Sequence, residues 1–301
     1  MTLCISYKYK NLDDGTTTAF CYSDSLITTL GARNHQLGIG GFLPSNTEIK
    51  HQTTRGIKIQ IVSAMTDGRR NVRDFVFSIA GAVPLGLQSL IHLDSVFKTF
   101  YGNYRFEEYI KRAERTLQEF WQDAWDKDIE YLVTAADDVG EIGIIYIRGA
   151  ESKSNLIVDE IEAKNDLLFA VTGDQAEQAK DLIRRETNSL MCAGIEMYSA
   201  LDLACIRMMR RAVEDQNQVF VGGSIQSCLL RGSKAQYLTL DNGKQLMYRG
   251  VEYSKEWNSS INKAPFPISY IGKDIHDPQI SIQEIVEKLE HFENRAKDAT
   301  A

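Results

Sequence analysis

The amino-acid sequence predicts an α+β protein in which β-sheets pack together and helices lie outside them. Stretches with alternating apolar residues come in blocks, and two pairs of stretches with helical periodicity separate these blocks. This block order differs from the regular exchange of single strands and helices that builds a parallel sheet. The 301 residues contain no linker-like change of composition, no internal repeat and no low-complexity tract. Their 43% hydrophobic and 25% charged residues suit a globular protein with a sizeable core.

Short alternating stretches predict the strands of the first block. They are residues 3–9, 17–23, 57–63 and 74–80. The first two flank the turn 11–15 and therefore predict a hairpin. Residues 31–54 are rich in glycine and polar side chains, which predicts a long loop or a short extra hairpin.

The hydrophobic period changes to that of a helix at Val83. The predicted helices are 83–101, 105–126, 175–187, 195–214 and a closing amphipathic helix, 281–297. The helix 105–126 carries an apolar stripe that we interpret as core packing: Phe106, Tyr109, Ile110, Ala113, Leu117, Phe120 and Trp121.

Strands resume after the first helix pair. The predicted strands are 129–135, 142–148, 154–159, 167–171 and 219–230. Asp137 and Asp138 lie between the first two of these strands and suit a turn better than catalysis. A hairpin is expected around residues 241–243, and residues 255–280 are expected to be irregular.

Charge and residue usage exclude several classes of function. The net charge is −7 and no Lys/Arg block is present, which argues against a nucleic-acid partner. No apolar run has the length of a membrane span, and residues 1–30 lack the apolar core of a signal peptide, so we expect a cytoplasmic protein without a membrane partner. The five cysteines are scattered without CxxC spacing and predict buried thiols. The five histidines show no ligand spacing, so we expect neither a metal nor a cofactor.

Thr2 directly follows Met1 and is the first candidate for chemistry. A small second residue allows Met1 to be trimmed, which would give Thr2 a free α-amino group beside its hydroxyl. An α-amino group with a pKa of about 8 takes up a proton at neutral pH, and a Thr hydroxyl with such an amine is a known nucleophile. Many chains begin Met-Thr without using it, so this position is informative only together with the residues that follow.

Four further motifs follow Thr2 in order. They are Ser23-Asp24-Ser25, Gly56-Ile57-Lys58-Ile59, Ser78-Ile79-Ala80-Gly81-Ala82 and the hairpin 132–146. With this order the chain resembles the proteasome-type N-terminal-nucleophile hydrolases. The nearest likeness is to the bacterial branch, which includes the peptidase of two-component bacterial proteases and the Anbu-type proteasome homologues. The likeness covers residues 2–232 apart from 31–54, which leaves 233–301 as a C-terminal extension of the domain 1–232.

The resemblance implies a four-layer αββα sandwich and a set of site residues. It makes Thr2 the nucleophile, Lys58 the catalytic lysine and Asp24 the carboxylate that holds this lysine. It assigns the oxyanion hole to the Gly81 N–H, and binding of the substrate backbone to Thr28, Ala80 and Ala82. A lysine cation beside the amine and hydroxyl of Thr2 favours their deprotonated forms, and a glycine lets the main chain approach the oxyanion closely.

Lys50 is an alternative candidate for the catalytic lysine, and Cys4 is an alternative candidate near Thr2. If Ile57 and Ile59 face the helices, alternation turns Lys58 towards the space between the sheets, whereas Lys50 lies in the polar loop and is the weaker candidate. Cys4 alternates in phase with Thr2 and could approach the site, although a small core residue is the simpler interpretation.

The chain departs from the family pattern in its auxiliary Asp/Ser pair. Gln218 and Val221 precede Gly222-Gly223, and the turn before the third helix has the sequence Thr172-Gly173-Asp174. Asp174 and Asp215 lie nearby but out of register. The spacings around Lys58 are longer than in the family, which we attribute to insertions at 31–54 and 66–73.

These features predict a threonine-type peptidase that forms a ring or open helical homo-oligomer of about six subunits or more and acts on peptides or unfolded proteins. Aromatic residues of the helix 105–126, namely Tyr109, Trp121 and Trp125, suit subunit contacts. An ATPase partner stays open. A catalytically silent scaffold subunit, and an amidase that uses Thr2 or Cys4 on a small substrate, are the alternatives.

Overall fold

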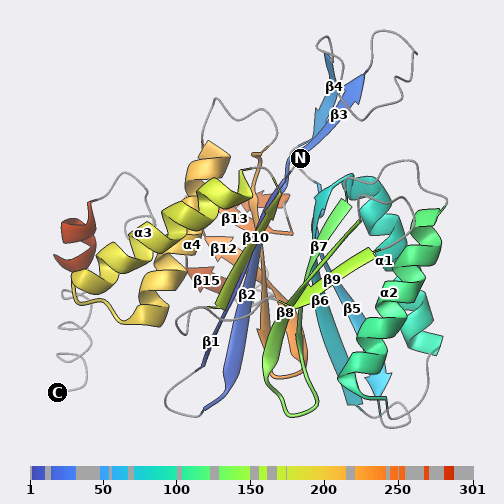
Figure 1. Ribbon diagram of the computed structural model, residues 1–301. Helices are drawn as coiled ribbons and strands as arrows, with labels where there is room; N and C mark the ends of the chain where they lie inside the picture. The colour runs from blue at the N-terminus through green and yellow to red at the C-terminus, as the bar shows by residue number, and fades with distance from the viewer. Residues whose placement is uncertain are drawn as a thin grey trace.

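The computed structural model has an α+β fold with two main antiparallel sheets and helices packed against both (Figure 1). It describes residues 2–10, 15–31, 48–53, 56–66, 71–99, 104–122, 129–149, 156–160, 168–173, 175–214, 221–241, 245–249, 251–254, 268–270 and 281–287. The predicted blocks of strands and helix pairs are present in the predicted order.

The first sheet has eight strands and contains the predicted hairpin. Its order is β10 (Leu168–Gly173), β1 (Leu3–Lys10), β2 (Thr17–Asp24), β11 (Ile225–Arg231), β12 (Lys234–Asp241), β13 (Gln245–Tyr248) and β14 (Val251–Ser254), with β15 (Ile268–Tyr270) parallel to β12. Alternation along β1 sends Leu3, Ile5 and Tyr7 to the helix side and Cys4 to the opposite face.

The second sheet has five antiparallel strands. Their order is β5 (Ile59–Thr66), β6 (Asn71–Gly81), β7 (Ile129–Ala136), β8 (Ile142–Gly149) and β9 (Leu156–Glu160). Asp137 accepts hydrogen bonds from the N–H groups of Val139 and Glu141, which makes the predicted turn between β7 and β8.

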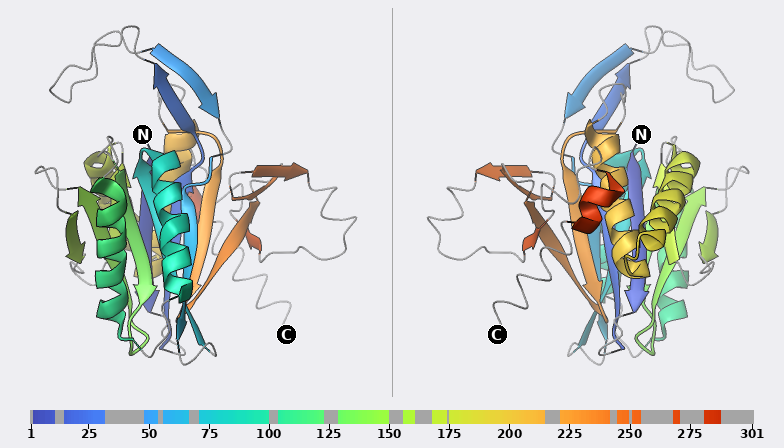
Figure 2. Two further views of the ribbon diagram at one scale, coloured as in Figure 1. Left: turned by 90° about the vertical axis from the view of Figure 1, so that its right-hand side faces the viewer. Right: turned by 90° about the vertical axis from the view of Figure 1, so that its left-hand side faces the viewer.

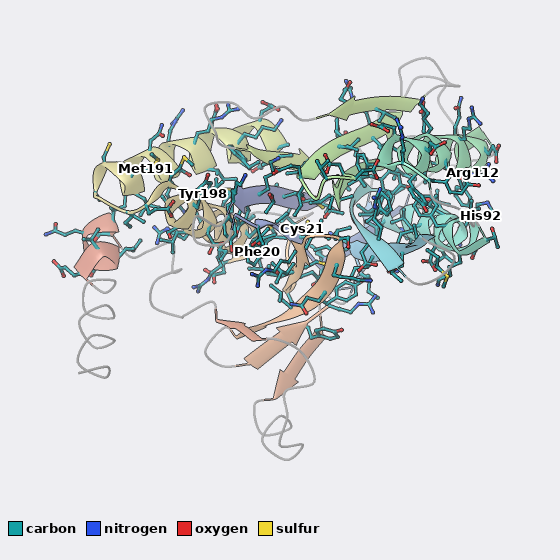
Figure 3. The ribbon with its side chains drawn as sticks, turned by 90° about the horizontal axis from the view of Figure 1, so that it is seen from below. Phe20, Cys21, His92, Arg112, Met191 and Tyr198 are labelled. Carbon is teal, nitrogen blue, oxygen red and sulfur yellow. The ribbon has the colours of Figure 1, made fainter. Side chains whose placement is uncertain are left out.

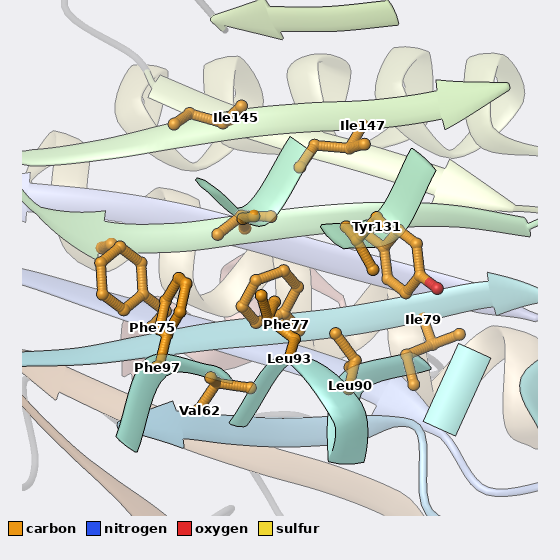
Figure 4. Close-up of a cluster of buried hydrophobic side chains, with 14 of the residues drawn as sticks. Val62, Phe75, Phe77, Ile79, Leu90, Leu93, Phe97, Tyr131, Ile145 and Ile147 are labelled. Carbon is orange, nitrogen blue, oxygen red and sulfur yellow. The ribbon is translucent and has the colours of Figure 1, made fainter. Parts of the chain in front are cut away.

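Each main sheet has a pair of helices on its outer face (Figures 1 and 2). The helices α1 (Val83–Thr99) and α2 (Phe106–Gln122) cover the second sheet, and α3 (Ala176–Cys192) and α4 (Met197–Glu214) cover the first. Phe75, Phe77 and Ile79 of β6 pack against Leu90, Leu93 and Phe97 of α1 (Figure 4). The predicted stripe of α2, from Phe106 to Phe120, belongs to this same core.

The inner faces of the two sheets share a separate core. Ala19 and Cys21 of β2 and Cys228 of β11 meet Ile59 of β5 and Val76 of β6 there. Figure 3 shows Cys21 near the centre of the molecule, whereas His92 lies on the outer helices at one side and Met191 at the other. The thiol of Cys21 donates to the Thr134 hydroxyl at 3.4 Å across this interface. The sheets are therefore joined by packed side chains.

The segment 31–54, which interrupts the family likeness, contains β4 (Glu48–Thr53), and this strand pairs with β3 (Ile27–Gly31), which ends where the segment begins. This hairpin extends away from the two main sheets at the end of the molecule where β1 begins (Figure 1). The expected alternatives were a loop and a short hairpin, and the described strands show the hairpin. Its backbone groups pair locally, so an insertion here leaves the main sheets intact.

Some predicted details are wrong. The strand expected at 219–230 begins only at Ile225, because residues 221–224 form an irregular segment around Gly223, which has a positive φ of 75°. Residues 268–270, expected to be irregular, form β15 against β12. All five cysteines are free, but Cys192, which was expected to be buried, is exposed.

The closing helix is described over residues 282–287. Ile285 is buried and packs with Leu190 of α3 and Leu203 of α4. Part of the C-terminal extension thus completes the core beside these helices. None of the helices in the described part of the chain is long and apolar enough to cross a membrane.

Candidate active site

The carboxylate of Asp24 collects four hydrogen bonds at the end of β2. Its Oδ1 accepts from the Leu3 N–H at 3.1 Å. Its Oδ2 accepts from the Lys58 ammonium at 2.8 Å and from the N–H groups of Leu26 and Gly222, each at 3.2 Å. Asp24 thus ties together the start of β1, the segment before β5 and the residues before β11. Its acceptor capacity is well used, as a buried carboxylate requires.

Lys58 and Asp24 form an ion pair with no solvent exposure on either side chain. The structure brings these two predicted residues together, but the alternation argument for Lys58 was wrong. Ile59 does not face the helices, because it packs between the sheets against Cys21. Lys58 lies outside the regular strand β5, so the two-residue period does not govern its direction.

Thr2 lies one residue before β1 and is completely buried. Its hydroxyl has no hydrogen-bond partner among the described residues. Leu3 is held by Asp24 on one side and pairs with Gly173 of β10 on the other. Gly173 has a φ of 97°, and a Cβ there would lie 1.7 Å from the Thr2 carbonyl oxygen. Only glycine allows this close approach of the two backbones.

The predicted oxyanion segment ends β6 beside the lysine. The Ile79 N–H donates to the Lys58 carbonyl at 2.8 Å, which joins the two segments. Gly81 has a φ of 86°, a conformation that favours glycine, and α1 begins two residues later. Ala80 is buried and Ala82 is partly exposed. The chain therefore turns at Gly81, two residues after the backbone contact between Ile79 and Lys58.

Two predicted positions lie in the extra hairpin. Thr28 pairs with Gln52 across β3 and β4. Lys50 lies in β4, not in a loop, where the register shifts between Thr29 and Leu30. The side chains of this hairpin are outside the described residues, so the substrate role of Thr28 stays a prediction.

Cys4 is also near the ion pair. Its thiol lies 3.3 Å from the Ser23 hydroxyl and donates to the Ile79 carbonyl at 3.4 Å. Burial raises the pKa of the Cys4 thiol to about 12, and the nearby Lys58 charge lowers it by less. The thiolate is the nucleophilic form, so this environment disfavours Cys4 as the nucleophile.

A second polar group beside the site was not found from the sequence. The Thr172 hydroxyl donates to the Glu130 carboxylate, which joins β10 of one sheet to β7 of the other. Thr172 pairs with Cys4 and Glu130 pairs with Ala80, so this link flanks both candidate segments. Burial and a hydrogen bond with Glu130 raise the pKa of Tyr146 to about 12. No sequence signal marks Glu130, because it occupies an ordinary strand position.

The structure describes only some of the residues at the place of the family's auxiliary Asp/Ser pair. Asp174, Asp215 and Gln218 lie outside the described residues. Gly222 is described, and its N–H binds Asp24 directly. Within the described ranges no group of three His, Cys, Asp or Glu side chains could hold a metal ion.

Comparison with solved structures identifies the class of protein that shares this fold. Its structural neighbours include Anbu proteins, proteasome-like bacterial homologues, and the match with a TM-score of 0.50 confirms the predicted resemblance at the level of the fold. An Anbu mutant from Hyphomicrobium sp. strain MC1 matches with a TM-score of 0.50 and 12% identity over 88% of this chain and 96% of that one. Anbu (ancestral β-subunit) from Yersinia bercovieri has a TM-score of 0.46 and 11% identity over 78% and 86%. A helical assembly of the Anbu complex from Pseudomonas aeruginosa has a TM-score of 0.44 and 13% identity over 87% of this chain and 94% of that one. At such identities the likeness shows the fold alone. No protein-family model and no curated protein matches the sequence.

Proposed function

We propose that this protein is an N-terminal threonine peptidase with the four-layer αββα sandwich of the proteasome-type hydrolases. The observation that supports it best is the buried Asp24–Lys58 ion pair, whose carboxylate also holds the residue next to Thr2. A lysine cation, a nearby hydroxyl without a partner among the described residues and a glycine at a strand end are the elements that this chemistry requires.

The energetic cost of the ion pair favours a functional role. Removing a carboxylate and an ammonium from water costs several kcal/mol for each ion, and their attraction often does no more than offset that cost. Apolar side chains of similar size would stabilise the fold at least as well. A completely desolvated pair beside a candidate nucleophile is therefore better explained by chemistry than by stability.

The proposed mechanism begins with removal of Met1, which gives Thr2 a free amine. The amine takes the hydroxyl proton as Oγ1 attacks the substrate carbonyl carbon. The Gly81 N–H and the Lys58 cation stabilise the negative charge that develops. The protonated amine then gives its proton to the leaving amine, and an acyl ester remains on Thr2. Water, deprotonated by the same amine, hydrolyses the ester and restores the hydroxyl.

Substrate binding and assembly complete the proposal. Ala80, Ala82 and Thr28 would hold the extended backbone of a peptide or an unfolded protein. The chain would form a ring or an open helical homo-oligomer that encloses its sites. Tyr109 is fully buried in the core of α2 and gives no support to this idea. Ile91 on α1 and Met191 on α3 are exposed apolar side chains of the outer helices and are candidate contact points between subunits.

Mass spectrometry after treatment with a peptide epoxyketone tests the chemistry. This reagent reacts with both the amine and the hydroxyl of an N-terminal threonine, so we expect loss of Met1 and one adduct on Thr2. Thr2→Ala is the matched control and should stay unlabelled. Retained Met1 with no adduct would favour the scaffold subunit. An active monomer of 34.0 kDa in light scattering would favour the small-substrate amidase.

A further inference from the structure

Gln226 of β11 is a buried amide that contacts both members of the ion pair through their backbones. It is 2% exposed. Its Oε1 accepts from the Lys58 N–H at 3.0 Å. Its Nε2 donates to the Gly56 carbonyl at 2.6 Å and to the Asp24 carbonyl at 3.2 Å. The side chain thus uses its acceptor and its amino group on three backbone groups of two separate segments.

The segment around Lys58 needs such a partner because it belongs to no strand. Residues 56–58 come before β5 and lack the ladder of hydrogen bonds that orients strand residues. The Gly56 N–H donates to Ser25 at 2.8 Å and the Lys58 carbonyl accepts from Ile79 at 2.8 Å. Gln226 binds the complementary groups, the Gly56 carbonyl and the Lys58 N–H. The segment is therefore held from both sides.

Only an amide of this length fits these three contacts. The site needs one acceptor for an N–H and a donor group for two carbonyls. A carboxylate cannot donate, and a thioether offers neither a strong donor nor a strong acceptor. Gln226 pairs with Ser23 on β2, so its backbone lies beside the strand end that carries Asp24.

We propose that Gln226 is a positioning residue for the reaction: it sets where the Asp24–Lys58 pair lies relative to Thr2. This inference rests on the proposed peptidase function. A displacement of about 1 Å in a catalytic group can cost about 10²-fold in rate. Gln226 acts through the backbones of Lys58 and Asp24, so its effect falls on the turnover step and not on substrate binding.

Two variants and a matched control test this role. Gln226→Met keeps the size and removes all three hydrogen bonds. Gln226→Glu keeps the acceptor for the Lys58 N–H and loses the donors. Gln60→Met is the control, because Gln60 lies on β5 two residues after Lys58 and, among the described residues, donates to the carbonyl of its neighbour Ile61 at 3.1 Å. For each protein, kcat per epoxyketone-titrated site, KM on one fluorogenic peptide, the pH–rate profile and the unfolding midpoint are measured.

We expect Gln226→Met to lower kcat per titrated site by about 10–100-fold with KM within about twofold of wild type. Gln226→Glu should also lower kcat and should move the acidic limb of the pH profile upward, because an added negative charge favours the protonated form of the site. Gln60→Met should keep the wild-type kcat and profile. Counting only titrated sites removes the effect of unfolded protein.

The results separate the two proposals. Wild-type kcat per site and an unchanged pH profile in both Gln226 variants would make Gln226 merely structural and would overturn the inference alone. If neither variant folds, an unchanged kcat in Gln226→Asn, whose shorter amide cannot span all three contacts, would overturn it in the same way. A wild-type protein that neither hydrolyses peptides nor reacts with the epoxyketone would overturn the peptidase function and this inference together.

Discussion

Removal of the Lys58 ammonium is the most direct test of the site. In Lys58→Met the side chain keeps a similar length, but Asp24 loses the ammonium group that lies 2.8 Å away. Because neither side chain is exposed to solvent, we expect no water to take the place of this ammonium group. The carboxylate keeps its hydrogen bonds from the N–H groups of Leu3, Leu26 and Gly222. The variant therefore isolates the charge of Lys58 while the neighbouring backbone contacts remain.

The expected magnitudes follow from this geometry. Breaking a buried pair by removing one partner typically costs about 3–5 kcal/mol, because an uncompensated charge stays buried. We expect the lower end, about 3 kcal/mol, since Asp24 retains three backbone donors. Peptide hydrolysis should fall by about 10²–10³-fold, the usual effect of losing one electrostatic stabiliser.

A double-mutant cycle separates the stability effect from the catalytic one. Lys58→Met, Asp24→Asn and the combined variant are compared by urea unfolding and by peptide hydrolysis. The combined variant should be more stable than the sum of the single losses implies, because it leaves no lone buried charge. Lys50→Met in the β3–β4 hairpin is the control and should keep near wild-type stability and activity.

Two results would refute the reasoning. Additive stability losses within about 0.5 kcal/mol would mean that Asp24 and Lys58 do not interact as a buried pair. Full activity in Lys58→Met together with loss of activity in Lys50→Met would move the catalytic lysine into the hairpin.

Three further predictions address other residues. Thr2→Ala should abolish peptide hydrolysis, and Thr2→Ser should keep part of the activity. Thr2→Ala should change the unfolding free energy by less than about 1 kcal/mol, because the Thr2 hydroxyl has no partner among the described residues. Wild-type turnover in Thr2→Ala would contradict the role of Thr2 as the nucleophile. Gly173→Ala places a Cβ 1.7 Å from the Thr2 carbonyl oxygen and should lower both stability and hydrolysis. The control Gly15→Ala, with a φ of 68° and no atom within 4 Å of the added Cβ, should cost only about 1–2 kcal/mol for its backbone conformation. Equal losses of stability in the two variants would argue against the contact between Gly173 and Thr2. Burial raises the pKa of Asp202, which accepts a hydrogen bond from Tyr7, from 3.8 to about 6. The folded state therefore binds the proton more tightly, and stability falls as pH rises from 3.8 to about 6. Asp202→Asn should be more stable than wild type at pH 7.5 by about 1–3 kcal/mol, with the difference vanishing near pH 4, as urea midpoints at both pH values would show.

Local sequence patterns predicted most of the elements because strand and helix periodicities are properties of neighbouring residues. The hairpin of β1 and β2 and the stripe of α2 are examples. Boundaries were less predictable where glycine or long-range pairing decides them. The strand β11 starts after Gly223, and β15 forms only because β12 offers it an edge.

The sequence by itself determined the order of the elements and the set of residue types from which the Thr2 site was predicted. Only the tertiary structure decided how these residues meet. Lys58 reaches Asp24 because it lies outside the period of β5, and no local pattern describes a residue outside a regular strand. Gln226 and Glu130 resemble ordinary strand residues in the sequence, and their importance comes from hydrogen bonds to segments that folding brings together. A buried polar group needs hydrogen-bond partners, and in this site those partners are residues that are distant in the sequence and close only in the folded chain.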